Sequence, residues 1–129
     1  MTVTYVIDGS GVTGLDSFWV VIGEAVNGPG GYFGRGLDAF ADCLRGGMGT
    51  PDDDDFVIEW RDHEMSARAL GHEETARYLR GLFPRAHVSS LPRLREELAR
   101  AEEGRGPTLF DRLLEIVREE TDPGTLRLL

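Results

Sequence analysis

The five residues FVIEW, Phe56 to Trp60, form a short apolar run that follows four consecutive acids. A run of this length, rich in aromatic and β-branched residues, is typical of an inner strand of a parallel sheet. Two further strand patterns lie near the ends of the chain. VTYVIDG at residues 3–9 is β-branched and leads into glycines, and TLRLL occupies residues 125–129. The sequence therefore predicts three strands, with the FVIEW strand inside the sheet.

The stretches between these strands carry apolar residues at helical spacing. Helices are expected over residues 16–27, 36–44, 63–70, 73–83, 91–103 and 108–121. Asp16 is the expected N-cap of the first helix, and Thr108 with Asp111 is the expected capping box of the last. Strands separated by helices imply right-handed parallel crossovers. We therefore expect an α/β fold, a three-stranded parallel sheet packed against helices, in one domain over residues 1–129.

The charge of the chain indicates what kind of partner it can bind. The net charge is −9, and there is no lysine among the 14 basic residues. A nucleic-acid binder needs a basic footprint, so this class is not expected. Nine acids and only two arginines lie between Asp38 and Glu64. An acidic region of this kind steers a basic partner toward it.

The location of the protein is predicted from what the sequence lacks. No apolar run approaches the ~20 residues of a membrane span, so no membrane partner is expected. The N-terminal residues do not show the basic and apolar regions of a signal peptide. The single cysteine, Cys43, cannot form an internal disulfide and is expected to pack in the core. We therefore expect a cytoplasmic protein.

Residues 30–47, GGYFGRGLDAFADCLRGG, place two carboxylates on one short helix between glycine clusters. Asp38 and Asp42 are four residues apart, which costs a helix ~0.2–0.5 kcal/mol through like-charge repulsion. Asp42 also lies in the last turn, where the helix dipole disfavours an anion by ~0.3–1 kcal/mol. Because the apolar residues of this helix face the core, both carboxylates should project into solvent. Acids placed on an exposed face where they lower the stability of their helix indicate a binding surface.

Other groups of polar residues give no sign of catalysis. The glycines of residues 30–36 follow a helix and do not fit the pattern of a phosphate-binding loop. The acids Asp52–Asp55 are consecutive, whereas the ligands of a calcium loop alternate, so we interpret them as a solvated acidic loop. The three histidines do not have the spacing of a zinc site. No catalytic residue, metal ligand or cofactor is therefore expected.

The segment YFGRGLDAFADCL, residues 32–44, closely resembles the corresponding segment of the barstar family, intracellular inhibitors of the ribonuclease barnase. VIEW, the opening YVIDG and the closing LLEIVREE and TLRLL fit the same family in order. The resemblance covers about the first 70 and the last 20 residues. It implies a barstar-like fold in which residues 71–106 are an added helical insert that leaves the inhibitory face alone.

The resemblance also implies a function and a set of site residues. In this family an acidic helix and the adjoining loop block the ribonuclease active site. The implied partner-binding residues are Tyr32, Asp38, Asp42, Gly46 and Glu119. Asp42 would be the main mimic of an RNA phosphate and Asp38 would pair with a second cation. The expected partner is a secreted or toxin-type ribonuclease, bound 1:1 by a chain that is monomeric when free and has no catalytic activity of its own.

Two alternatives stay open on the sequence alone. Ala41 and Gly47 stand where the family has tryptophans, and Arg35 stands where an acid is common. Because aromatic residues are frequent interface hot spots, the same fold could be an acidic binding module whose partner is not a ribonuclease. A metal-dependent hydrolase that uses Asp52–Asp55 and a histidine is the other alternative.

Overall fold

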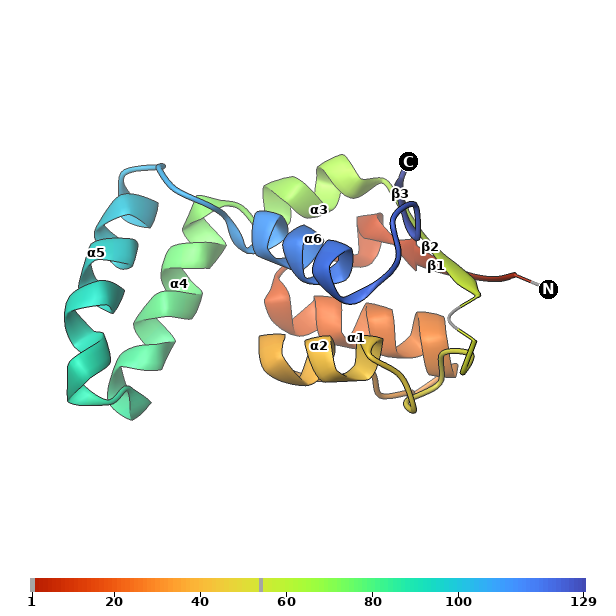
Figure 1. Ribbon diagram of the computed structural model, residues 1–129. Helices are drawn as coiled ribbons and strands as arrows, with labels where there is room; N and C mark the ends of the chain where they lie inside the picture. Colours follow the sequence, from red (N-terminus) through yellow and green to blue (C-terminus); the bar gives the residue numbers. More distant parts are fainter. Residues whose placement is uncertain (1, 54) are drawn as a thin grey trace.

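Three parallel strands and six α-helices make up the protein, which a computed structural model describes over residues 2–53 and 55–129 (Figure 1). The strands are β1 (Val3–Asp8), β2 (Phe56–Arg61) and β3 (Leu126–Leu128). The helices are α1 (Leu15–Asn27), α2 (Leu37–Leu44), α3 (His63–Ala69), α4 (His72–Leu82), α5 (Leu91–Glu102) and α6 (Leu109–Glu120). Short 3-10 turns lie at Gly9–Gly11, Phe83–Arg85 and Val88–Ser90.

The sheet has the order β1-β2-β3, with both strand pairs parallel. This confirms the predicted α/β class and the inner position of the FVIEW strand. Ile58 pairs with Tyr5 on one side and with Leu126 on the other. The face that carries Tyr5 and Ile58 is buried, whereas Val6 on the opposite face of β1 is 39% exposed. The helices therefore cover mainly one face of the sheet.

Aromatic rings from three helices and the central strand meet in the main core. The Phe18 ring of α1 stacks on Trp60 of β2 with centroids 5.2 Å apart. Phe40 of α2 meets the edge of Phe18 at 5.6 Å, and Phe110 of α6 meets Trp60 at 5.2 Å. All these rings are buried. Rings of this size bury about 150–250 Å² each, so this cluster fixes α1, α2 and α6 against the sheet.

The helix α3 is tied to the end of the sheet by a buried hydroxyl. Trp60 Nε1 donates to Ser66 Oγ at 3.0 Å, and Ser66 Oγ donates to the Gly9 carbonyl at 2.9 Å. A Cβ at Gly9 would lie only 2.3 Å from the Arg61 carbonyl oxygen. This close approach requires glycine directly after β1, where the sequence has it.

The helices α4 and α5 form an antiparallel pair, which we call the hairpin, set to one side of the remaining elements, the body (Figure 1). The hairpin has a small apolar cluster of its own, made by Ala76, Leu79, Leu94 and Ala101. The half-buried Tyr78 packs against both this cluster and the main core. The segment predicted as an insert, residues 71–106, thus adds a second core beside the first.

Polar contacts join the hairpin to the body. Glu74 Oε2 accepts a hydrogen bond from the backbone N–H of Leu15, at the start of α1, at 2.7 Å. Thr75 Oγ1 accepts from the N–H of Leu109, at the start of α6, at 2.9 Å. Both N–H groups are first-turn donors without partners inside their helices. The hairpin therefore caps two helices of the body.

The helix ends agree with the prediction to within one residue, with one error in the caps. Thr108 and Asp111 form the predicted capping box of α6. Asp16, however, is not the N-cap of α1, because the cap is Gly14, whose N–H donates to Ser17 Oγ at 3.2 Å. The tertiary contact from Glu74 supplies the acceptor that Asp16 was expected to provide. None of the helices in the described ranges is long and apolar enough to cross a lipid bilayer.

Candidate protein-binding face

The helix α2 is short, and the loop before it fixes its position. Gly34 has φ 89°, and a Cβ there would lie 2.7 Å from the backbone nitrogen of Phe40. The neighbouring Phe33 is fully buried and its ring lies 6.0 Å from that of Phe40. Only glycine fits both the left-handed conformation and the close approach. The loop and the helix are therefore held as one unit.

Asn27, the last residue of α1, holds the two loops that flank α2. Its Nδ2 donates to the carbonyl of Tyr32 at 2.7 Å and to the carbonyl of Met48 at 2.8 Å. The side chains of Tyr32 and Met48 are 44% and 42% exposed. One amide thus places two exposed apolar side chains beside α2. Tyr32 is one of the residues predicted from the sequence, whereas Asn27 and Met48 are not, because no local pattern links these positions.

The outer side of α2 presents the predicted carboxylates to solvent. Asp38 and Asp42 are exposed, whereas Phe40, Cys43 and Leu44 of the same helix are buried. Burial raises the pKa of the Cys43 thiol, and the charge of Asp42 raises it further. The thiol is therefore neutral and packed, as predicted, and is not a reactive nucleophile.

Arg45, just after α2, connects the acids of two helices. Its guanidinium pairs with Asp42 and also with Glu120 of α6, with Nε at 2.7 Å from Oε2 and Nη2 at 3.0 Å from Oε1. The hydrogen bond to Glu120, together with the charges of Glu120 and Asp42, raises the pKa of Arg45. The ion pair offsets the cost predicted for Asp42 in the last turn of the helix. It also ties α2 to α6 on the surface.

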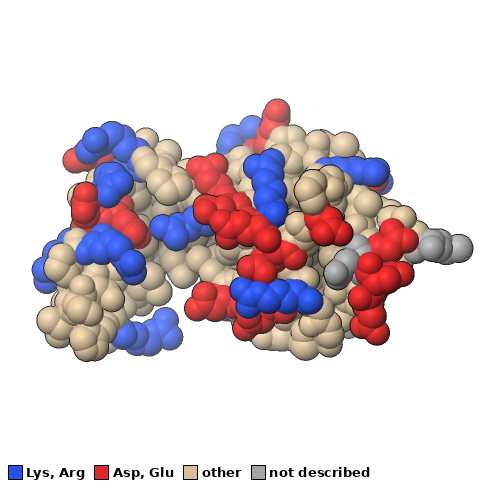
Figure 2. All heavy atoms as spheres, in the orientation of Figure 1, with Lys and Arg blue, Asp and Glu red and all other residues tan. Residues whose placement is uncertain are grey.

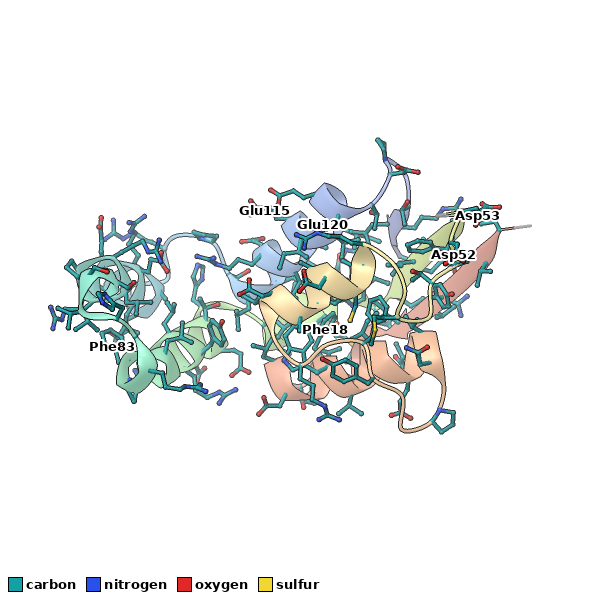
Figure 3. The ribbon with its side chains drawn as sticks, turned by 60° about the horizontal axis from the view of Figure 1, so that its bottom comes forward. Phe18, Asp52, Asp53, Phe83, Glu115 and Glu120 are labelled. Atoms are coloured by element: carbon teal, nitrogen blue, oxygen red, sulfur yellow. The ribbon has the colours of Figure 1, made fainter. Side chains whose placement is uncertain are left out.

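The helix α6 adds its own carboxylates to this surface. Figure 2 shows Asp and Glu side chains gathered over α2 and α6, with basic side chains among them. In Figure 3, Glu120 lies between α6 and α2, and Glu115 projects from the same side of the molecule. Glu119, predicted from the resemblance, is exposed on α6. We call this surface the acidic face: Asp38 and Asp42 of α2 with Glu115, Glu119 and Glu120 of α6.

Glycines at the end of α2 let the chain turn tightly beside the acidic face. Gly46 has φ 125° and Gly47 has φ 86°, conformations that L side chains rarely adopt. A Cβ at either position would meet nothing within 4 Å. The backbone at Gly46 is thus open to a partner, as the prediction for this residue requires.

The acidic loop before β2 lies apart from Glu120 (Figure 3). Asp53 Oδ1 accepts a hydrogen bond from the N–H of Asp55, and Asp55 Oδ1 accepts from the hydroxyl of Thr2 at 2.7 Å. Asp54 lies outside the described residues. In the described part of the chain, no three His, Cys, Asp or Glu side chains are placed to hold a metal ion. The geometry therefore gives no support to the hydrolase alternative.

The fold and the acidic face define a class: a small α/β protein that presents carboxylates on a rigid helix, with two exposed apolar side chains next to them. Such a surface fits a basic protein partner. Residues 2–87 match the family model described as Barstar (barnase inhibitor), and the chain belongs to this family. No curated protein and no solved structure gives a significant match to the chain.

The extent of the family match bears on the predicted site and insert. It includes Tyr32, Asp38, Asp42 and Gly46, and it ends before α6 and Glu119. It also runs through α4, which the sequence analysis placed in the insert, and ends before α5. The boundaries of the insert at residues 71–106 thus stay a prediction.

Proposed function

We propose that the chain is an intracellular, cytoplasmic inhibitor of a secreted or toxin-type ribonuclease, which it blocks in a 1:1 complex without any catalysis of its own. The observation that carries the proposal is the pair of exposed carboxylates, Asp38 and Asp42, on a helix held rigidly between two loops. The membership of the chain in the Barstar (barnase inhibitor) family supports the same partner class.

A ribonuclease site binds the phosphates of RNA with cationic side chains. In the proposed complex, Asp42 takes the place of a phosphate and accepts charge-assisted hydrogen bonds, while Asp38 pairs with a second cation. Tyr32 packs on the catalytic histidine, and Gly46 lets the two backbones approach closely. Glu119 adds a peripheral charge that steers the encounter.

Arg45 lets Asp42 exchange its ion-pair partner within the free protein for a cation of the ribonuclease. It holds Asp42 in the free protein and also makes two hydrogen bonds to Glu120. When a cation of the ribonuclease takes Asp42, the Arg45 guanidinium keeps the carboxylate of Glu120. When Asp42 leaves Arg45, the guanidinium of Arg45 therefore keeps an anionic partner. An unpaired charge would be costly in a buried interface.

The experiment is a titration of barnase, and of barnase-type ribonucleases from the producing organism, with the purified chain while RNA cleavage is followed. Cleavage should fall linearly and stop at one chain per enzyme, and raising the salt concentration should slow association. If the folded chain leaves cleavage unchanged at several-fold excess over every enzyme tested, the proposal is overturned. A stable complex with a protein that does not cleave RNA would then favour the alternative, an acidic module with another partner.

A further inference from the structure

The hairpin differs in charge from the protein around it. Residues 71–106 carry seven arginines and six glutamates, a balance of +1, while the remaining residues carry a balance of −10. Some of these arginines face a cleft between the hairpin and the body. The cleft has a volume of about 260 Å³ and lies between the start of α1 and α2 on one side and α4 with the following turn on the other. We call it the basic cleft, because Arg35, Arg77 and Arg85 line it, with Asp16 as the one acid.

Two of the three guanidiniums in the basic cleft are available to a ligand. Arg77 is bound to Glu74, with Nε at 2.6 Å from Oε1. Within the described residues, neither Arg35 nor Arg85 makes an ion pair or a side-chain hydrogen bond. Arg35 comes from the body and Arg85 from the hairpin, so the two cations face the cleft from opposite sides. This arrangement favours an anionic group between them.

The inner wall of the basic cleft is apolar. Leu15 and Trp19 of α1 are 5% and 6% exposed, and the half-buried Leu82 faces the cleft from α4. An ion pair next to such a wall is less screened by water than a pair on an open surface. The aliphatic stem of an acidic side chain would also find contacts there. The basic cleft thus suits a carboxylate carried on a peptide chain better than a small hydrated anion.

The basic cleft and the acidic face are neighbours. Gly36, which lines the cleft, is the N-cap of α2, two residues before Asp38. Tyr78 also lines the cleft, and burial raises the pKa of its hydroxyl. The charges of Arg85 and Asp38 act on that hydroxyl in opposite directions. A partner seated on α2 therefore reaches both surfaces at once.

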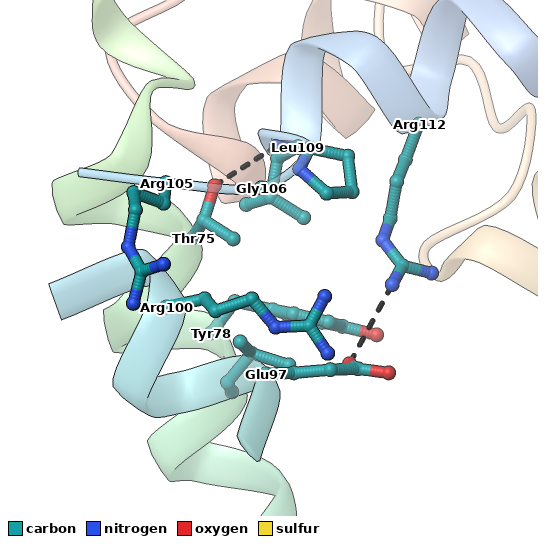
Figure 4. A pocket seen from close by; sticks show the side chains of 10 residues that line it. Thr75, Tyr78, Glu97, Arg100, Arg105, Gly106, Leu109 and Arg112 are labelled. Carbon is teal, nitrogen blue, oxygen red and sulfur yellow. Dashed lines mark hydrogen bonds and ion pairs between the residues drawn. The ribbon is translucent and has the colours of Figure 1, made fainter. Parts of the chain in front are cut away.

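A second arginine-lined pocket lies between α4, α5 and α6 (Figure 4). Its volume is only about 30 Å³, room for one water molecule. Its cations already have partners: Arg112 lies 3.5 Å from Glu97, and Arg100 lies 3.0 Å from Glu96. The basic cleft is larger, and among the described residues neither Arg35 nor Arg85 is ion-paired with a carboxylate.

We propose that the basic cleft receives an acidic segment of the same partner that docks on the acidic face, with a carboxylate of that segment held between Arg35 and Arg85. The inference rests on the proposed function for the identity of the partner. It departs from the expectation that residues 71–106 leave the inhibitory face alone, because Arg85 lies in that segment. The binding surface then has two neighbouring regions of opposite charge, the acidic face and the basic cleft. Such a pattern fixes the orientation of the partner and rejects proteins that are basic throughout.

The chemistry of the cleft is tested with a blocked tetraglutamate peptide, added to the isotope-labelled full chain and followed by NMR. The backbone amides of Gly36 and Leu82 and the side-chain Nε–H groups of Arg35 and Arg85 should shift in a saturable way. A tetraglutamine peptide should leave them in place. Shifts that map elsewhere, or displacement of the peptide by inorganic phosphate at equal concentration, would overturn the inference.

Matched double variants test which arginines are responsible. Arg35→Gln with Arg85→Gln should weaken peptide binding by roughly tenfold or more, as expected for the loss of two partly screened ion pairs. Arg68→Gln with Arg95→Gln removes the same charge from exposed positions of the body and the hairpin outside the cleft, and should change binding less than twofold. Equal losses in both double variants would mean that net charge alone attracts the peptide.

The ribonuclease assay separates this inference from the proposed function. Against an enzyme that the chain inhibits, the double variant of Arg35 and Arg85 should need a concentration roughly tenfold higher for half inhibition. Asp42→Ala should lose inhibition but keep the binding of the tetraglutamate peptide. Absence of inhibition by the parent chain refutes the proposed function, whereas full inhibition by the double variant refutes the inference.

Discussion

The body and the hairpin are both helical around apolar side chains, but they are held together differently. The body is built on large rings: Phe18, Phe40 and Trp60 are fully buried, and the Phe18 ring contacts the other two. The hairpin cluster contains two alanines and two leucines, and its helices expose several ion pairs between arginine and glutamate. The body therefore holds most of the fold's stability, whereas the hairpin mainly adds surface and caps.

The first prediction compares the loss of one apolar side chain in each of the two cores. Phe18→Ala should lower the free energy of unfolding by ~3–5 kcal/mol, because it removes a ring that touches α2 and β2. Leu94→Ala in the hairpin should cost ~2 kcal/mol, at the low end of the range, because this small cluster can collapse around the gap. Denaturant unfolding of both variants gives the two values.

Hydrogen exchange shows whether the two cores unfold together. In Leu94→Ala the amides of α4 and α5 should exchange faster while those of β1 and β2 keep their protection. If the protection of the sheet amides falls by the same amount, the body and the hairpin unfold as one cooperative unit. That result would contradict the claim that their stabilities differ.

The second prediction compares two acids with nearly the same surroundings. Asp42 is 71% exposed and pairs with Arg45 three residues away, and Glu96 is 68% exposed and pairs with Arg100 four residues away. Alanine at either position should change the free energy of unfolding by less than about 0.5 kcal/mol. Only Asp42→Ala should weaken inhibition, by ~2–5 kcal/mol, since it leaves the partner's cations without an anion.

These two variants are measured by chemical denaturation and by titration against a ribonuclease that the parent chain inhibits. Equal inhibition by Asp42→Ala and the parent chain would refute the proposal that Asp42 mimics a phosphate. A loss of inhibition in Glu96→Ala as well would mean that the partner contacts the hairpin far from the acidic face.

The third prediction concerns Glu74, which links the hairpin to the body. The hydrogen bond from Arg77 holds the pKa of Glu74 below its ordinary value of 4.5, against the effect of burial, and the N–H of Leu15 lowers it further. Glu74→Gln should therefore lower stability by ~1–2 kcal/mol at pH 7, since a hydrogen bond to a charged group is lost.

The pH dependence of this variant follows from the direction of the pKa change. A carboxyl whose pKa is lowered on folding stabilises the native state above its unfolded pKa, and this contribution disappears as the pH falls through the folded value. The difference between the parent and Glu74→Gln should thus shrink below pH 4.5. Glu73→Gln, at an exposed neighbouring position on α4, is the control. If the stability difference between the parent and Glu73→Gln also shrinks below pH 4.5, the pH dependence does not come from Glu74.

The fourth prediction concerns Asn27, which holds the two loops beside α2. Asn27→Ala removes two hydrogen bonds at an exposed site and should cost ~1 kcal/mol. Inhibition should weaken more than this, because Tyr32 and Met48 lose their common anchor. Glu24→Ala, an exposed change on the same helix, should affect neither quantity. If the loss of inhibition in Asn27→Ala equals the loss of stability, the loops do not act as a positioned unit.

The order of residues along the chain was enough to predict the parallel sheet, the bounds of the six helices to within one residue, and the exposure of Asp38 and Asp42. These properties follow from the spacing of apolar residues along each segment, and that spacing is local. It also located the loop–helix segment on which the family resemblance rests, and the family match confirms that resemblance.

Contacts between residues far apart in the chain became clear only from the folded arrangement. Glu74 caps α1 from 59 positions away, and Arg45 joins Glu120 from 75 positions away. Asn27 reaches Met48, and Arg35 and Arg85 face one cleft. Such contacts depend on how whole helices pack against the sheet. The spacing of apolar residues indicates which side of a helix a side chain lies on, but it does not indicate which other element that side contacts. The exposed acids of α2 were therefore predictable, whereas the contacts that join α2 to α6, to the loops and to the hairpin were not.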